Sequence, residues 1–220
     1  MDFILTEEEV RVLGVLAEKQ MTTPEYYPMS LNAVKVACNQ KSNRDPVVEY
    51  EEAAVLEALD SLRRKGLALV VSGGGSRVRK YEHKLREALF LSQKEQALLT
   101  MMMLRGPQTL GELRSRTDRM AEFGDLAEVE ETLRDLSAAE RSPRPLVMML
   151  PRMPGQKENR YAQLLAGEPD LEALAAREAS AAPQPAGNSR LAELEEKVEM
   201  LTRELQELKE QFRQFKQQFE

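Results

Sequence analysis

Hydrophobic and polar positions follow the same order twice along the chain: three helix-like stretches and then two short strand-like ones. In the first copy, Thr6 and Glu9 form a capping box ahead of an apolar helical face. Gly66 follows the third helical stretch, where it is expected to end the helix. The predicted helices of this copy span residues 7–20, 31–39 and 51–65, and the predicted strands span residues 67–71 and 77–81.

The second copy repeats this order with different residues. Ser92 and Glu95 form another capping box, Gly106 and Pro107 end that helix, and Thr109 can cap the next one. The predicted helices start at residues 93, 110 and 126, and the predicted strands span residues 146–150 and 160–163. Three helices followed by a two-stranded hairpin is the order of a winged helix-turn-helix. We therefore expect a mainly α (α+β) fold with two tandem winged helix-turn-helix domains.

Beyond these copies the chain changes character. Residues 168–189 are rich in Ala and Pro and are expected to form a linker that is partly helical. The last segment has apolar residues at alternating steps of three and four, the seam of a left-handed coiled coil. These seam residues are Leu191, Leu194, Val198, Leu201, Leu205, Leu208, Phe212, Phe215 and Phe219. The expected domains are residues 1–85, 86–167, 168–189 and 190–220.

An apolar seam of this length needs a partner, and the expected partner is a second copy of the chain, giving a homodimer. The alternative is that this helix folds back onto a winged domain of its own chain. The strict 3.5-residue period favours a helical partner. In a parallel dimer, Glu204 would face Lys209 of the other chain, although one such pair is weak evidence for the strand order.

Composition narrows the function classes. The 220 residues include 37 acidic and 31 basic ones, for a net charge of −6, but residues 1–166 hold 25 acidic and 24 basic ones. The acidity is therefore concentrated in the tail and argues only mildly against a nucleic-acid partner. With Cys38 as the one cysteine and His83 as the one histidine, no intrachain disulfide and no Cys/His zinc cluster can form. We expect a cytoplasmic protein with no metal, no cofactor and no membrane span.

Several uninterrupted segments carry a family resemblance. They are residues 22–32 (TTPEYYPMSLN), 37–47 (ACNQKSNRDPV), 111–116 (GELRSR) and 154–161 (PGQKENRY). These segments resemble the YceH family over residues 3–167. The resemblance implies two winged helices in tandem, the fold derived above, and it brings no catalytic residues. The turn Gly73-Gly74-Gly75 is richer in glycine than expected of the family.

Individual residues give no enzyme signature. Gly73-Gly74-Gly75 joins two predicted strands and lacks the following Lys of a phosphate-binding loop, so a wing turn is the preferred interpretation. Cys38 is expected to be a small buried thiol, and His83 a surface or hinge residue. The turn around Arg44, which is framed by Asn43 and Asp45, is expected to be braced by side-chain hydrogen bonds to the backbone.

The charge pattern is unusual for a DNA-reading domain. The third helix of each copy presents mainly carboxylates outward, whereas a helix in the major groove should present Arg, Lys, Asn or Gln. Positive charge lies on the predicted wings and on the second helix of the second copy. The nucleic-acid-binding candidates are Arg77, Arg79, Lys80, Arg114, Arg116, Arg119, Arg152, Lys157 and Arg160. The alternative is that these cations pair with the acidic helices or are simply solvated.

Two functions remain open at this point, of which the first is the leading hypothesis and the second the alternative. The first is a non-enzymatic, dimeric DNA-binding protein of the transcription-regulator type that contacts phosphates through its basic wings. The second is a protein–protein interaction adaptor whose acidic third helices dock a basic or amphipathic partner, as kleisin-binding winged-helix modules do.

Overall fold

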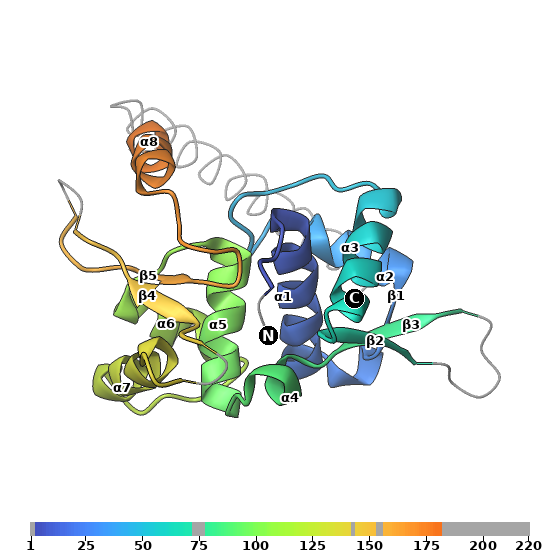
Figure 1. Ribbon diagram of the computed structural model, residues 1–220, viewed down its shortest axis with the longest axis horizontal. Helices are drawn as coiled ribbons and strands as arrows, with labels where there is room; N and C mark the ends of the chain where they lie inside the picture. The colour runs from blue at the N-terminus through green and yellow to red at the C-terminus, as the bar shows by residue number, and fades with distance from the viewer. Residues whose placement is uncertain (1–2, 72–77, 142–143, 153–155, 182–220) are drawn as a thin grey trace, which may run out of the picture. The chain divides into compact units, whose positions relative to one another are not determined.

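The computed structural model describes residues 3–71, 78–141, 144–152 and 156–181 (Figure 1). By contacts the chain divides into two units, Met1–Pro169 and Asp170–Glu220. The first unit is mainly helical with two small antiparallel sheets, in agreement with the expected α+β class. The Gly73-Gly74-Gly75 turn, Arg77 and the whole coiled-coil seam from Leu191 to Phe219 lie outside the described residues.

The first half of this unit follows the predicted order of elements. The helices are α1 (Glu7–Thr22), the short 3-10 helix η1 (Pro24–Tyr26), α2 (Leu31–Cys38) and α3 (Glu52–Arg64). The strands are β1 (Met29–Ser30), β2 (Ala68–Val71) and β3 (Lys80–His83). The Thr6–Glu9 capping box forms as predicted, and Ser30 accepts a hydrogen bond from the Ala33 N–H at the start of α2.

These three strands form one antiparallel sheet in the order β1-β3-β2. Val70 of β2 lies opposite Tyr81 of β3, and Met29 of β1 lies on the other side of Tyr81. The sequence predicted the returning strand over residues 77–81, so it ended the strand two residues too early. The observed strand includes His83 because this residue pairs with Ala68 of β2, and its N–H, which faces away from β2, donates to the Tyr27 hydroxyl at 2.7 Å.

A short helix that the sequence reading did not predict, α4 (Leu85–Leu89), leads into the second half. There the helices are α5 (Gln93–Arg105), α6 (Leu110–Thr117) and α7 (Leu126–Ser137), and the strands are β4 (Val147–Met149) and β5 (Tyr161–Gln163). The Ser92–Glu95 capping box is confirmed, and Thr109 forms another one with Glu112. An isolated antiparallel β-bridge pairs Gln108 with Tyr161 of β5. Gln108 thus occupies the same place before α6 that β1 occupies before α2.

Helices α1 and α5 lie side by side at the centre of the unit and join its two halves (Figure 1). Both are buried around most of their circumference, since residues 9–18 and 96–104 are all buried. Gly14 permits this close approach because a Cβ atom there would lie 3.1 Å from the Met103 Cβ atom. One hydrophobic core therefore runs through both halves. The expected domain boundary after residue 85 falls inside α4, within this compact unit.

The long connection between α2 and α3, residues 39–51, is held by buried polar contacts. Arg44 is fully buried and binds the Glu18 carboxylate of α1 with two hydrogen bonds, at 3.0 and 2.6 Å. Its Nε donates to the Ala37 carbonyl at 3.1 Å. Arg11 donates to the Cys38 and Pro46 carbonyls from the same side. The expected bracing role of Arg44 is confirmed, and the structure adds the ion pair to Glu18.

Further contacts fix both ends of this connection. The Asn39 side chain and the Tyr50 backbone exchange two hydrogen bonds of 3.0 and 2.8 Å, which closes the loop. The Asp45 N–H donates to the Leu104 carbonyl of α5 at 3.0 Å. The segment Cys38–Pro46, part of the family resemblance, thus fastens the first half of the unit to the second.

The second unit is described only through α8 (Leu171–Ala181), which lies in the stretch expected to be partly helical. No helix among the described residues is long and apolar enough to span a membrane.

Candidate functional site

The first hairpin, formed by β2 and β3, carries two exposed cations. Lys80 is the first residue of β3 and Arg79 directly precedes it, and neither side chain makes a hydrogen bond or an ion pair within the described parts of the chain. Their side chains are therefore available for contacts with phosphate or carboxylate groups. The third candidate of this wing, Arg77, lies outside the described residues.

The arginines around α6 differ in their surroundings. Arg114 is exposed and donates to the Gly124 carbonyl at 2.9 Å. Arg119 is exposed as well, but α6 ends at Thr117, so Arg119 lies in the following turn and does not continue the helical spacing. The sequence predicted helical spacing for all three arginines. In the structure the helix ends before Arg119, where the Thr117 carbonyl accepts hydrogen bonds from the Met120 and Ala121 N–H groups.

Arg116 and Arg160 converge on one carboxylate. Glu112 lies 3.2 Å from the Arg116 guanidinium and 3.0 Å from that of Arg160. Arg116 also hydrogen-bonds Gln108, and Arg160 donates to the Pro107 carbonyl at 3.0 Å. These two cations thus pair with a carboxylate of α6 itself, and not with the acidic third helices that the sequence offered as partners. Glu112 orders them and offsets part of their charge.

The second hairpin, formed by β4 and β5, carries the last two candidates. Arg152 is exposed and donates to the Gln156 carbonyl at 3.1 Å, and Lys157 is exposed. Figure 1 shows the two hairpins pointing away from opposite ends of the unit. The described basic residues of the two hairpins therefore do not form one continuous surface within a single chain.

The outer faces of the third helices are acidic, as the sequence predicted. On α3, Glu52 and Glu57 are exposed, and on α7, Glu130, Glu131 and Asp135 are exposed. Arg134 is the basic residue among them on α7 and lies 4.0 Å from Glu130. Phosphates would be repelled from these surfaces, whereas a basic partner would be attracted.

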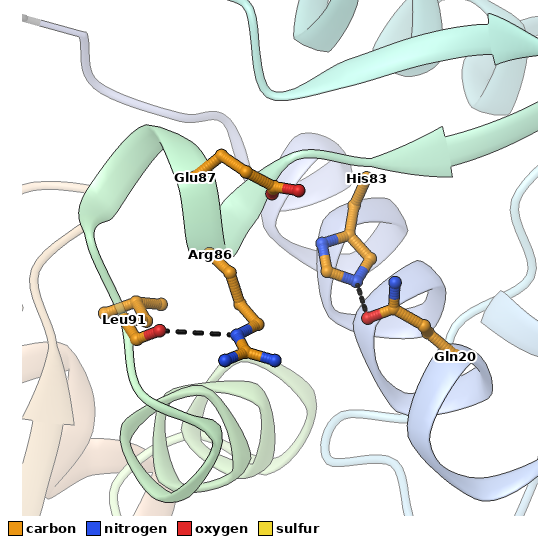
Figure 2. A pocket seen from close by; sticks show the side chains of 5 residues that line it. All are labelled: Gln20, His83, Arg86, Glu87 and Leu91. Carbon is orange, nitrogen blue, oxygen red and sulfur yellow. Dashed lines mark hydrogen bonds between the residues drawn. The ribbon is translucent and has the colours of Figure 1, made fainter.

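A polar hollow of about 470 Å³ lies between the end of α1 and α4 (Figure 2). It is lined by Gln20, His83, Arg86, Glu87 and Leu91. In Figure 2 the His83 ring points toward Gln20, and the Arg86 Nε points at the Leu91 carbonyl, to which it donates at 3.3 Å. Two hydrogen bonds join the lining residues to one another, from His83 to Gln20 and from Arg86 to Leu91.

His83 is 3% exposed, which corrects the expectation of a surface histidine. The aromatic ring of Tyr27 packs edge-on against it, and the strand continues farther than predicted, so the ring is carried into the interior. The Leu85 N–H donates to Nδ1 at 3.1 Å, which leaves Nε2 as the protonated nitrogen that donates to Gln20 at 2.8 Å. Burial lowers the pKa of His83 to about 4, so the ring is neutral at pH 7.

Cys38 is fully buried, as expected for a small structural thiol. Burial raises the pKa of its thiol to about 12, despite the nearby Arg11 and Arg44 guanidinium groups. Among the residues that the structure describes, no group of three or more His, Cys, Asp and Glu side chains is placed to hold a metal ion.

The sequence reading did not single out the buried polar residues Arg11, Glu18 and Gln96. Their positions could have indicated burial, because all three lie on helical faces next to apolar residues. These faces are covered by the contacts between α1, α5 and the 39–51 connection.

The family model described as "Protein of unknown function, DUF480" matches residues 5–156. The chain belongs to this family, which is also the YceH family whose resemblance was expected from the sequence.

Relatives of the family are similar over their whole length. The chain is 54% identical over 223 residues to a UPF0502 protein of Geotalea uraniireducens and 52% identical over 226 residues to one of Geobacter sulfurreducens, with all of each chain covered. It is 49% identical over 218 residues to a UPF0502 protein of Azoarcus, covering 99% of this chain and 95% of the relative. None of these names assigns an enzymatic activity.

Proposed function

We propose that the chain is a non-enzymatic tandem winged-helix protein that acts as a protein-interaction adaptor. The order α1-β1-α2-α3-β2-β3, with its sheet order β1-β3-β2, supports a winged helix in the first half. In the second half, α5, α6, α7 and the β4–β5 hairpin follow the same order, and the Gln108–Tyr161 bridge stands in the place of β1.

The observation that carries this proposal is the exposed acidity of α3 and α7. In a DNA-reading winged helix these helices enter the major groove, where Glu52, Glu57, Glu130 and Glu131 would lie between phosphates. The same carboxylates suit a partner segment that is basic or amphipathic. Since α3 and α7 belong to the two different halves, the chain offers two such surfaces.

The test is affinity capture from nuclease-treated extract with the full-length protein. We expect one protein to be recovered stoichiometrically and to be lost when Glu130 and Glu131 are changed to Lys, or when Glu52 and Glu57 are. The matched control is Glu122→Lys with Glu158→Lys, which reverses two exposed charges away from the third helices. Recovery of nothing but nucleic acid would contradict the adaptor function.

DNA binding through the first wing is the second candidate, and it rests on a different observation. Arg79 and Lys80 are exposed neighbours at the beginning of β3, Arg79 just before the strand, with no acidic partner in the described part of the chain. Cations on a hairpin can reach backbone phosphates without inserting α3 into a groove. The coiled coil expected from the sequence would supply two such wings per dimer.

Gel-shift titrations at several salt concentrations test this candidate. Binding should weaken with salt, and the salt slope should fall when Arg77, Arg79 and Lys80 are changed to Ala. Arg134→Ala, an exposed change on the acidic α7, is the control and should leave the slope unchanged. Absence of binding to any genomic fragment at low salt would rule this candidate out.

A further inference from the structure

Strand β2 forms one edge of the three-stranded sheet, because the order is β1-β3-β2. Along a strand of an antiparallel sheet, the backbone N–H and C=O groups of one residue point to the neighbouring strand, and those of the next residue point to the opposite side. The Lys84 N–H donates to the Leu67 carbonyl at 2.8 Å, so Leu67, Leu69 and Val71 are the residues bonded to β3. The N–H and C=O groups of Ala68 and Val70 therefore face the open edge.

A groove of about 570 Å³ runs along this edge, between β2 and the end of α3. Its strand side is formed by Ala68, Leu69 and Val70, and its helix side by Asp60, Arg63 and Arg64. Leu69 and Val70 are half-buried, so apolar side-chain surface accompanies the free backbone groups. The groove thus combines the features used when an extended peptide adds a strand to a sheet.

The turn between α3 and β2 holds the two sides of the groove in place. Gly66 adopts a positive φ of 72°, and its N–H donates to the Arg63 carbonyl at 3.0 Å. The Leu67 N–H donates to the Leu62 carbonyl at 2.9 Å. These two hydrogen bonds fix the connection between α3 and β2. The backbone on both sides of the groove therefore loses little conformational entropy when a ligand binds.

The charge of the groove selects the ligand. Arg64 is exposed, and its side chain makes no hydrogen bond or ion pair within the described residues. Arg63 binds Asp60 at 2.8 Å, but both side chains are more than 40% exposed, so this pair is weak and a carboxylate can compete for the guanidinium. Two arginines and one aspartate leave a net positive groove beside an open strand edge.

We propose that the edge of β2 is a docking site for an extended acidic segment of another protein. The segment adds as a strand beside Ala68 and Val70, and its carboxylates bind Arg64 and Arg63. This surface lies at the end of α3 opposite Glu52 and is independent of the adaptor and DNA-binding proposals, which use other residues.

The test is selection of displayed ten-residue peptides from a random library on the intact protein, followed by titration of one selected peptide. We expect Asp or Glu to alternate with β-branched residues in the selected peptides. Arg64→Glu should weaken binding at least about tenfold, since a charge-assisted hydrogen bond is replaced by repulsion. Arg79→Glu makes the same charge change just before β3, outside the groove, and should leave affinity within about twofold.

A backbone measurement separates strand addition from simple charge attraction. The selected peptide should slow hydrogen exchange at the Ala68 and Val70 amides, and Val70→Pro, which removes an outward N–H, should abolish binding while the thermal transition is retained. The proposal is overturned if selection yields no acidic peptide, if both amides stay unprotected, or if duplex DNA or a second copy of the chain displaces the peptide. Glu52→Lys with Glu57→Lys should leave this binding intact, even if it abolishes the adaptor interaction.

Discussion

Arg44 contributes to stability because it is buried together with its counter-ion. Its side chain is 0% exposed, and that of Glu18 is 9% exposed. Removal of one member of a buried pair leaves the other charge in a medium of low polarity, which is far more costly than the loss of an exposed pair. The hydrogen bonds from Arg44 to the Ala37 and Asn43 carbonyls would be lost in the same step.

We expect Arg44→Met to lower the free energy of unfolding by about 3–5 kcal/mol. Arg63→Met breaks the exposed pair with Asp60 and should cost less than about 1 kcal/mol. Urea denaturation of both variants checks this difference. Equal effects would mean that burial does not govern the Arg44–Glu18 interaction.

His83 makes stability depend on pH in the mildly acidic range. Its folded-state pKa of about 4 lies below the ordinary value of 6.5, so between these values the unfolded chain binds the proton that the folded chain excludes. Stability contributed in this way is complete above pH 6.5 and is lost as the pH falls toward 4.

The expected loss from this residue between pH 7.5 and pH 5 is about 2 kcal/mol. Urea titrations at both pH values should show this difference between the native protein and His83→Gln, whose amide does not titrate in this range. An identical pH dependence in the two proteins would show that the pKa of His83 is the same in the folded and the unfolded chain.

At the scale of elements, the contact between α1 and α5 is the main connection of the first unit. Periodicity predicted both helices, and their caps, at nearly the observed bounds, since these depend on residues three or four positions apart. That the two helices lie against each other was not predictable, because this contact joins residues about ninety positions apart. The close approach at Gly14 follows from that packing.

Gly14→Val should destabilise the protein by about 2 kcal/mol, because a Cβ atom 3.1 Å from the Met103 Cβ atom cannot be relieved by a rotamer change. Gly111→Val places the same side chain on α6 with nothing within 4 Å of its Cβ atom and should change stability by less than about 0.5 kcal/mol. Thermal denaturation of the two variants provides the comparison. A neutral Gly14→Val would mean that α1 and α5 can separate at little cost.

At the scale of the whole molecule, the apolar seam of residues 191–219 predicts that two chains associate. The seam follows from sequence spacing alone and lies outside the described residues. Paired wings and paired acidic helices in one particle would follow from such a dimer, and multivalent binding would strengthen weak contacts at each site.

Light scattering should give twice the chain mass of 25.0 kDa for the full-length protein and the single mass after removal of residues 190–220. Leu205→Glu in the seam should also produce the monomer, whereas Arg203→Glu, which lies outside the seam, should leave the dimer intact. An unchanged mass after truncation would show that the coil packs within its own chain.

The sequence by itself determined the order of helices and hairpins, the caps at Thr6, Ser92 and Thr109, and the acidic outer faces of α3 and α7. These features depend on local spacing and on residue chemistry, which the sequence displays directly. The tertiary structure alone decided that His83 and Arg44 are buried, that Glu112 pairs with Arg116 and Arg160, and that the basic hairpins lie at opposite ends. Each of these depends on contacts between distant segments, where burial and pairing set the energy of a charged or polar group.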